Sequence, residues 1–411
     1  ALASSPTVGV YLDETPMPFS VMTQGVVLDL QRVEALKGPQ GTLFGQNATG
    51  GLVNYVANKP TQEFEGGVEA SYGRFETMDL QGFVSGPITD SLSYRVAARS
   101  IQSGDWQKQY TNSSDNAPDP YWTELEPIAP ARSYRIDNEA GAKDFVSWRA
   151  ALLFEPNDRF SALLTGTGFI DEGDSQRPQL YGFATLNPVN GLTPQIANYP
   201  RAPRDNDAAD WGPCVNIDGG SEADVYGFRN PSPTSILDLY TITETGPEGE
   251  ALNLANRRYD RCEPAEKDND YWSASLRMDI GLTDDITLTS LTSYGKFTRD
   301  QKLESDGTVY QDYESYQEGY IKDFYQELRV AGTFGGNGNW VVGGNYEQTK
   351  TWDSFLQTYG WSTAVPTQVF SRIPLGPTNP NSKMDIDIWA VFANAEFELT
   401  DRLTLQAGVR Y

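Results

Sequence analysis

The chain of 411 residues contains no histidine, and this absence excludes several kinds of chemistry. Histidine is the commonest protein ligand of zinc, copper and haem iron, and it is the usual general base of enzymes. The sequence also lacks a Gly-x-Ser-x-Gly elbow, a phosphate-binding loop and a set of zinc ligands. Pairs of carboxylates are frequent, but they arise by chance in a chain this acidic. We therefore expect no enzyme, no cofactor and no metal site.

Long hydrophobic runs are missing as well. No apolar run approaches the roughly 18 residues of a membrane-spanning helix, and the mean hydropathy is −0.50. Such values are typical of a soluble protein. A membrane β-barrel, however, exposes only every second residue of a strand to lipid, so its hydropathy averages out along the sequence. Low hydropathy therefore does not exclude a membrane protein built from strands.

Positive charge and cysteine are both scarce. The chain has 31 Lys and Arg against 56 Asp and Glu, which gives a net charge of −25. This charge repels phosphates, so we expect no nucleic-acid partner. The two cysteines, Cys214 and Cys262, lie in one polar stretch rich in Pro, Gly and Asp. They are a candidate disulfide if the protein is exported, and two unpaired thiols in a loop are the alternative.

Tyr, Trp and Gly are abundant, which favours strands and turns over helices. From Gly66 onward, apolar and polar residues alternate with a period of two, as in strands with one apolar face. In the C-terminal segment, for example, the apolar positions are Leu403, Leu405, Ala407, Val409 and Tyr411. Similar alternation covers residues 94–99, 146–154, 272–280, 327–334 and 389–397. Counting such runs predicts about eleven strands.

Two features distinguish these strands from those of a soluble sandwich. The strands are about 10 residues long, which is enough to cross a hydrocarbon layer when tilted, whereas ordinary strands have about 5–6. The connections also alternate between short turns and long polar loops. The turns are at residues 89–91, 156–158, 283–285, 335–338 and 400–401, and the loops at 104–143, 171–269, 301–321 and 351–385. This asymmetry is typical of a large antiparallel barrel in an outer membrane.

The segment 32–60, RVEALKGPQGTLFGQNATGGLVNYVANKP, joins two strand-like runs through closely spaced glycines. Glycine at this density marks positive φ angles or close approach of backbone. The order of these residues resembles the end of the plug domain in TonB-dependent outer-membrane receptors. The matching positions are Arg32, Glu34, Lys37, Gly38, Pro39, Gly41, Gly45, Gly50 and Gly51. A glycine-rich turn in a soluble β protein is the alternative.

The resemblance implies an all-β fold, namely a transmembrane antiparallel β-barrel with an N-terminal plug remnant. We expect residues 1–61 to be the C-terminal part of the plug and residues 62–411 the N-terminal part of the barrel, with long extracellular loops. A closed barrel of this family has about 22 strands, so about eleven correspond to a partial barrel. An unclosed barrel leaves edge strands unpaired in lipid, and we therefore expect the chain to be a fragment that lacks its signal peptide and TonB box.

The resemblance also suggests a ligand site in the plug. Residues 17–24 look like an apical plug loop, which in the family faces outward and touches the ligand. Met17, Phe19, Met22 and Gln24 are the candidate ligand contacts, because Met and Phe offer adaptable apolar surface. A turn that is merely packed inside the barrel is an equally good interpretation.

Three charged residues of the motif, Arg32, Glu34 and Lys37, stand where the family has residues that tie the plug to the barrel wall. Most receptors have Arg at the position of Lys37, and Lys loses the bidentate geometry of a guanidinium. The possible wall partners are the inward-facing acids Asp79, Asp279, Glu327 and Glu396. Ordinary polarity of the barrel interior explains these acids equally well.

For function, the resemblance implies an active transporter in the outer membrane of a Gram-negative bacterium, surrounded by outer-membrane lipid. We expect its ligand to be a ferric siderophore and its energy source to be the TonB–ExbB–ExbD complex. Two alternatives stay open at this point. The first is a transporter of the same class with another cargo, namely an oligosaccharide, cobalamin or an aromatic compound. The second is a passive porin-like barrel.

Overall fold

The structure is a computed structural model in which the described residues are 6–38, 41, 50–109, 139–175, 182–186, 194–198, 207–208, 243–245, 251–253, 267–304, 313–335, 337–359, 381–400 and 402–411. Pro39, Gly45, Cys214 and Cys262 lie outside these residues, so the predicted disulfide is not addressed. Strands dominate the described part of the chain, together with the four-residue 3-10 helix η1 (Ser20–Thr23). None of its helices has the length and apolar character needed to cross a membrane.

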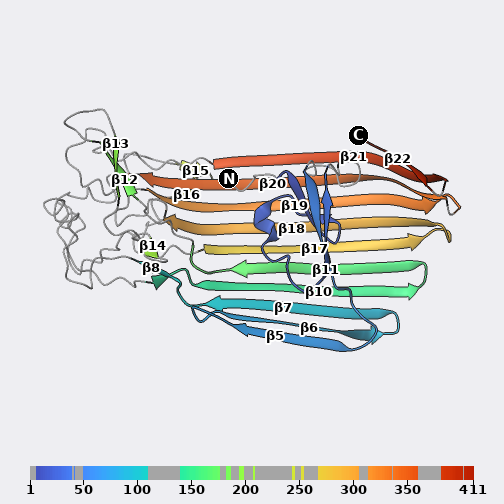
Figure 1. Ribbon diagram of the computed structural model, residues 1–411, viewed down its shortest axis with the longest axis horizontal. Helices are drawn as coiled ribbons and strands as arrows, with labels where there is room; N and C mark the ends of the chain where they lie inside the picture. Colours follow the sequence, from blue (N-terminus) through green and yellow to red (C-terminus); the bar gives the residue numbers. More distant parts are fainter. Residues whose placement is uncertain are drawn as a thin grey trace.

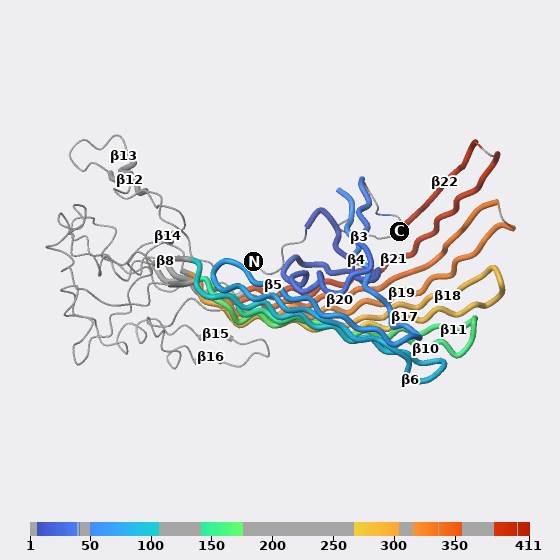
Figure 2. Tube along the Cα trace, turned by 60° about the horizontal axis from the view of Figure 1, so that its bottom comes forward, coloured from blue at the N-terminus to red at the C-terminus, as the bar shows by residue number. Residues whose placement is uncertain are grey.

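The main body is one antiparallel sheet of eleven strands, as the alternation predicts. In chain order they are β5 (Glu65–Tyr72), β6 (Met78–Thr89), β7 (Leu92–Ser103), β10 (Lys143–Asn157), β11 (Phe160–Asp171), β17 (Lys267–Gly281), β18 (Ile286–Glu304), β19 (Tyr313–Thr333), β20 (Gly338–Tyr359), β21 (Asn381–Thr400) and β22 (Leu403–Arg410). Each pairs with the preceding and following strand of this series (Figure 1). The sheet curves into a trough, as expected for part of a barrel wall (Figure 2).

Short strands lie in two of the long connections. The connection between β7 and β10 contains β8 (Gln107–Gln109) and β9 (Glu139–Ala140). The connection between β11 and β17 contains β12 (Gly182–Leu186), β13 (Pro194–Asn198), β14 (Asp207–Ala208), β15 (Thr243–Thr245) and β16 (Ala251–Asn253). Both connections begin and end close to the predicted limits of residues 104–143 and 171–269.

The strands of the second half are longer than predicted. β19, β20 and β21 have 21, 22 and 20 residues, not about 10, so the connections after β18 and β20 are shorter than expected. About 10 residues suffice to cross the membrane. Beyond that depth both faces of a strand meet polar surroundings, and the apolar half of the alternation disappears while the hydrogen-bonded ladder continues. The pattern therefore ends before the strand does.

The convex face of the sheet is apolar. Large apolar side chains are exposed on it, for example Leu152, Leu164, Val342 and Trp389, with exposed fractions of 42%, 47%, 52% and 61%. Aromatic rings form two bands across this face. The loop-side aromatic band consists of Trp272, Tyr294, Phe324, Tyr346, Trp389 and Tyr411, and the turn-side aromatic band consists of Phe154, Phe160, Phe334 and Phe397. Such girdles mark the two membrane interfaces of an outer-membrane barrel, so the convex face is the lipid face.

The N-terminal part forms a separate four-stranded sheet, ordered β2 (Thr15–Pro16), β1 (Val8–Leu12), β4 (Gly51–Ala57), β3 (Leu30–Lys37). This plug sheet lies against the concave side of the trough (Figure 2). Gly51 opens β4 with φ +133°, and a Cβ there would lie 2.4 Å from the Leu36 carbonyl oxygen. Only glycine fits that position, which explains one residue of the motif. The predicted boundary between residues 61 and 62 falls in the link from Ala57 to Glu65.

The lipid face makes a depth-dependent prediction. Leu164 lies between the two aromatic bands, whereas Leu403 opens β22 beside a short turn. In the full-length protein, Leu164→Arg should lower the free energy of unfolding by about 2–4 kcal/mol, and Leu403→Arg by about 0–1 kcal/mol, because burying a charge in hydrocarbon is most costly at mid-depth. Urea unfolding in lipid vesicles measures both values. Equal losses would contradict this assignment of the lipid face.

Candidate functional site

The plug meets the wall through an apolar contact. Phe169 (β11), Tyr271 (β17), Phe297 (β18) and Ile321 (β19) lie opposite one another on successive strands, and we call this row the apolar seat. Their exposed fractions are only 0–6%. The plug residues that pack on the seat are Leu12, Met17, Phe19, Met22 and Val26. Full burial of each such side chain contributes roughly 1.5–3 kcal/mol, so this contact holds the plug loop firmly.

A second contact joins the β1–β2 turn to the wall by ion pairs. Asp13 and Glu14 form this turn with φ angles of 49° and 69°, the left-handed region that glycine or asparagine usually occupies. The turn directs the Glu14 carboxylate at two wall arginines. Arg277 Nη1 lies 2.8 Å from Glu14 Oε1, and Arg329 Nη2 donates to Glu14 Oε2. Holding two non-glycine residues in this conformation is unfavourable, and the ion pairs offset part of that penalty.

The pKa values of the two turn carboxylates are shifted in opposite directions. Burial raises the pKa of Glu14, but the attraction of Arg329 and Arg277 outweighs it, so the Glu14 pKa lies below its ordinary value. Burial also raises the pKa of Asp13, and here it prevails although Asp13 Oδ1 accepts a 2.9 Å hydrogen bond from the Ala57 amide. Glu14 is therefore the charged anchor of the turn, while Asp13 serves the plug's own packing.

A third contact fixes the chain just before β3. Asp29 forms a bidentate pair with Arg95 of β7, at 2.6 Å for both bonds, and both side chains are at most 7% exposed. Arg149 of β10 donates to the Leu28 carbonyl oxygen at 2.5 Å and to that of Val26 at 3.3 Å. Breaking a buried pair by removing one partner typically costs about 3–5 kcal/mol. Glu14 and Asp29 thus fasten the plug to different wall strands.

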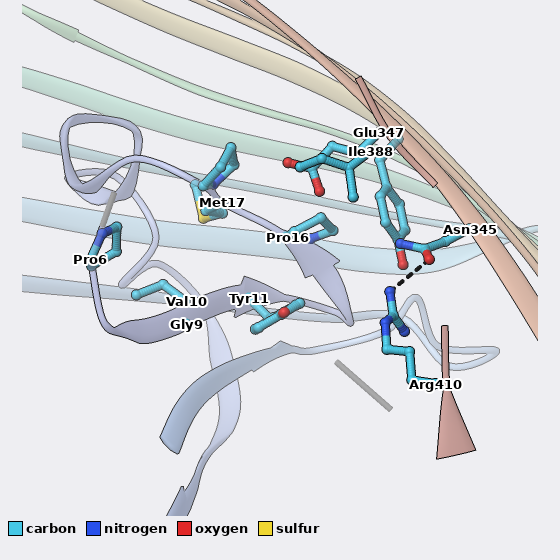
Figure 3. Close-up of a pocket in the computed structure, with 12 residues that line it drawn as sticks. Pro6, Gly9, Val10, Tyr11, Pro16, Met17, Asn345, Glu347, Ile388 and Arg410 are labelled. Atoms are coloured by element: carbon cyan, nitrogen blue, oxygen red, sulfur yellow. Dashed lines mark hydrogen bonds between the residues drawn. The ribbon is translucent and has the colours of Figure 1, made fainter. Parts of the chain in front are cut away.

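Towards β22 the plug faces a polar part of the wall. A small cavity there lies between the β1 side of the plug and strands β19 to β22, as Figure 3 shows. Tyr11 and Met17 line it from the plug, and Asn345, Glu347 and Arg410 line it from the wall. Arg410 Nη2 donates to Asn345 Oδ1 at 2.7 Å. Burial raises the pKa of Tyr11, so this phenol is neutral at physiological pH. The plug is therefore seated on apolar groups on one side and polar groups on the other.

The structure distributes the four predicted ligand contacts between two environments. Met17, Phe19 and Met22 are 4%, 2% and 2% exposed and belong to the cluster on the apolar seat. Gln24, which follows η1, is exposed. Met17, Phe19 and Met22 therefore lie as the alternative interpretation expects, in a turn packed inside the barrel. Ligand contact by the four stays a prediction, and Gln24 is the one that is accessible in this arrangement.

Two of the three motif charges pair within the plug sheet. Arg32 Nε lies 2.7 Å from Glu34 Oε1 on the plug sheet, and Glu34 also accepts 2.9 Å from Asn54 Nδ2. The hydrogen bonds from Asn54 and Arg32 lower the pKa of Glu34. Three of the acids considered as partners pair instead with wall arginines: Asp79 with Arg99, Asp279 with Arg277, and Glu327 with Arg329.

The ion pairs between plug and wall in the described residues have carboxylates on the plug and guanidinium groups on the wall, and wall ties of the motif residues stay a prediction. Inward-facing Arg95, Arg149, Arg277 and Arg329 are visible in the sequence as the polar half of the alternation. Their plug partners are Glu14 in a two-residue turn, Asp29 just before β3, and two backbone carbonyl groups, and none of these carries a recognisable motif. The inward-facing wall arginines are thus predictable from the alternation, whereas their partners on the plug are not.

Comparison with known proteins agrees with this architecture. Residues 215–411 match the family "TonB dependent receptor-like, beta-barrel". The pesticin receptor of Yersinia enterocolitica is 35% identical over 113 residues, which are 27% of this chain and 17% of that protein. The ferripyoverdine receptor of Pseudomonas aeruginosa is 42% identical over 67 residues, 16% of this chain and 8% of that protein.

The fold is shared with solved receptors over nearly the whole chain. The ferric yersiniabactin uptake receptor FyuA from Yersinia pestis superposes with a TM-score of 0.62 at 16% identity, covering 99% of this chain and 47% of that one. The ferripyoverdine-bound receptor of Pseudomonas aeruginosa superposes with a TM-score of 0.59 at 14% identity, covering 100% of this chain and 46% of that one. The chain therefore spans about half the length of these receptors.

Residues 215–411 of this chain are therefore similar to the barrel of TonB-dependent receptors, and nearly the whole chain shares the fold of such receptors. The all-β fold predicted from the sequence is confirmed, and so is the partial barrel of eleven strands. The family match and the outer-membrane relatives place this chain in the Gram-negative outer membrane, as predicted from the sequence. The lipid face between the two aromatic bands and the plug in the trough are the corresponding structural features.

The Glu14 anchor makes a pH-dependent prediction. Because its native pKa is lowered, the stability from Glu14 is fully present above the ordinary pKa of about 4.3 and is lost as the pH falls through the native value. Glu14→Gln should weaken the plug by about 1–2 kcal/mol at neutral pH and remove this acid-dependent part. Hydrogen exchange of the amides in β1 and β2, measured on the full-length receptor from pH 7 down to pH 3, reports both effects.

Glu398→Gln is the matched control, because Glu398 is exposed on β21 and lies outside the plug contacts described here. Its exchange profile should follow that of the wild type. Identical profiles for Glu14→Gln and the wild type at all pH values would contradict the role assigned to Glu14.

Proposed function

We propose that this chain is part of a receptor that imports an iron–siderophore complex across the outer membrane. The observation that carries the proposal is a plug sheet held by side-chain contacts inside the trough of a membrane barrel wall. The names of relatives support the cargo: they are pesticin receptor, ferripyoverdine receptor and ferric enterobactin receptor, and a further relative is an iron-regulated outer membrane virulence protein.

The proposed mechanism is binding followed by displacement of the plug, without covalent chemistry. A ligand captured on the loop side has to pass the plug that packs on the apolar seat. Passage therefore requires at least the contacts of Met22 and Phe19 with the seat to open, or those on the polar side around Tyr11. A ligand can shift the plug only by the difference in its affinity for the docked and displaced states. The remaining work comes from an external energy source.

We propose TonB, acting with ExbB and ExbD, as that energy source, in keeping with the family. Force applied to the plug would break the ion pairs of Glu14 and Asp29 before the wall itself is disturbed. The wall strands are joined by continuous ladders of backbone hydrogen bonds, whereas each of these plug anchors consists of one carboxylate. The proposal includes no enzymatic activity and no resident cofactor.

For the ligand contacts, we propose that Gln24 touches the bound complex in the docked plug. Met17, Phe19 and Met22 first hold the loop on the seat and become available to the ligand only when the plug moves. Gln24 is exposed at the end of η1, with Ser20, also exposed, at its beginning. The two positions thus offer a matched pair for mutagenesis within one turn of the plug.

Two other functions remain candidates. A passive porin-like barrel is disfavoured, because an open pore does not need a domain that is fastened inside its lumen by buried ion pairs. A different cargo in the same transporter class is harder to separate from the proposal. Copper transporter OprC, for example, superposes with a TM-score of 0.50 at 11% identity, which is a likeness of fold alone.

Uptake by cells tests the proposal. A strain that lacks the intact gene should lose uptake of ⁵⁵Fe-loaded siderophores and grow poorly under iron limitation, while its growth on defined glycans stays normal. In the complemented strain, Gln24→Ala should reduce siderophore binding about tenfold, equivalent to about 1.4 kcal/mol, whereas Ser20→Ala should leave binding unchanged. Normal iron uptake in the deletion strain would end the siderophore assignment, and loss of glycan growth would favour an oligosaccharide cargo.

A further inference from the structure

Three arginines of the inner wall surround Ala97 and reach the same stretch of the plug. Arg95 and Arg99 stand two residues to either side of Ala97 on β7, and Arg149 of β10 pairs in register with Ala97. The strands β7 and β10 lie side by side in Figure 1. All three guanidinium groups donate to residues 26–29 of the plug. The wall therefore holds the plug chain shortly after η1, at the end of the turn that carries the predicted ligand contacts.

The three arginines differ in how their charge is balanced. Arg95 forms an ion pair with Asp29 of the plug. Arg99 forms one with Asp79 on the neighbouring strand β6. Arg149 is only 3% exposed, its Nε has no hydrogen-bond partner, and none of the carboxylates in the described residues forms an ion pair with it. An apolar side chain of similar size typically stabilises a buried position at least as well as a charge, so stability of the wall does not explain this arginine.

The hydrogen bonds of Arg149 go to two backbone carbonyl groups of the plug. Its Nη1 donates to the Leu28 oxygen at 2.5 Å, and its Nη2 donates to the Val26 oxygen at 3.3 Å. Both plug residues are buried, and the Val26 oxygen also accepts a bond from the Leu28 amide at 3.0 Å. The bond from Arg99 to the Val27 oxygen is 3.5 Å long and therefore weak. Arg149 is thus the arginine that fixes the backbone at Val26 and Leu28.

This fixed backbone lies next to Gln24. Only Gly25 separates Gln24 from Val26, so the two Cα atoms are at most about 7–8 Å apart. The backbone of Gly25 packs closely on the apolar seat, since a Cβ at this position would lie 3.0 Å from Phe169 Cδ1. The side chain of Gln24 is exposed, while the two residues that follow it are held by the seat and by Arg149. A shift of the Val26 carbonyl group would therefore move Gln24 as well.

We propose that Arg149 is a positioning residue for cargo binding, which rests on the proposed function in which Gln24 touches the bound complex. By holding the carbonyl groups of Val26 and Leu28, Arg149 fixes the place at which Gln24 meets the cargo. Arg149 itself lies beneath the plug chain and does not touch the cargo. A contact group that is held in its binding position loses less conformational entropy on binding, so this arrangement raises the affinity of the docked plug.

Hydrogen exchange of the full-length protein in detergent tests the positioning without any cargo. Arg149→Met removes the guanidinium group and keeps a long apolar side chain. The amides of Val26 and Leu28 should then exchange on the order of tenfold faster, because the carbonyl groups lose their wall partner. The amides of residues 52–57 in β4 should exchange as in the wild type, because the seat and the other anchors keep the plug docked. The variant should unfold at the same temperature as the wild type or higher, which also shows that it folds.

A double-mutant cycle then tests the link to the cargo, with the ⁵⁵Fe-loaded siderophore that the deletion strain fails to take up. Arg149→Met should bind this siderophore about tenfold more weakly than the wild type, as Gln24→Ala does. The double variant Gln24→Ala/Arg149→Met should bind within about twofold of Gln24→Ala alone, because both changes remove the same contact. Arg99→Met is the matched control: it removes the neighbouring arginine, whose bond to the plug is long, and should bind within about twofold of the wild type.

Four results would overturn the proposal. The first is unchanged exchange of the Val26 and Leu28 amides in Arg149→Met. The second is loss of protection in β4 together with these amides, which would make Arg149 a general anchor of the plug. The third is wild-type affinity of Arg149→Met when Gln24→Ala binds more weakly. The fourth is a further loss of about tenfold in the double variant, which would show that Arg149 acts independently of Gln24.

Failure of the proposed function gives a different pattern. Normal siderophore uptake by the deletion strain, or wild-type affinity of Gln24→Ala, would overturn the cargo or its contact with Gln24, and the role of Arg149 in cargo binding would fall with it. The exchange of the Val26 and Leu28 amides would still show whether Arg149 fixes the turn.

Discussion

The burial of the plug loop on the apolar seat is the contact on which the arrangement of this protein depends. Phe169, Tyr271, Phe297 and Ile321 stand in one row only because four strands pair in a fixed register, so the wall has to form before the seat exists. Within the plug itself, the same cluster contains Leu12 of β1, with Val10 and Tyr55 packed against it. A four-stranded sheet of this size buries few apolar groups, and docking supplies the missing burial.

The ion pairs then determine orientation rather than adding much net stability. Glu14 and Asp29 reach β17, β19 and β7, so the plug is fixed at separate places along the wall and cannot rotate on the seat. A buried pair contributes little beyond a well-packed apolar contact, but losing one partner is costly. This combination suits a plug that is held in one position at rest and released as a unit. The polar cavity beside Tyr11 leaves one flank less tightly packed.

Much of the fold follows from the sequence alone, because alternation reports directly which residues face lipid. The eleven strands, the short turns and the two longest connections were predictable in this way. The ends of β18 to β21 were not, since both faces become polar above the membrane. The plug–wall ties were also out of reach: the Glu14 turn carries no motif, and its arginines are 263 and 315 residues away in the chain. Long-range pairs of this kind depend on register, which composition does not encode.

The seat can be tested by Phe169→Ala in the full-length receptor, with Phe154→Ala on the lipid face as the control. Hydrogen exchange of amides 12–28 reports the stability of the docked loop, and exchange of the wall strands reports the barrel. We expect Phe169→Ala to lower the protection of the loop by about 3–5 kcal/mol while the wall stays protected, and Phe154→Ala to leave the loop unchanged. Undiminished protection of the loop in Phe169→Ala would show that something other than the seat holds the plug.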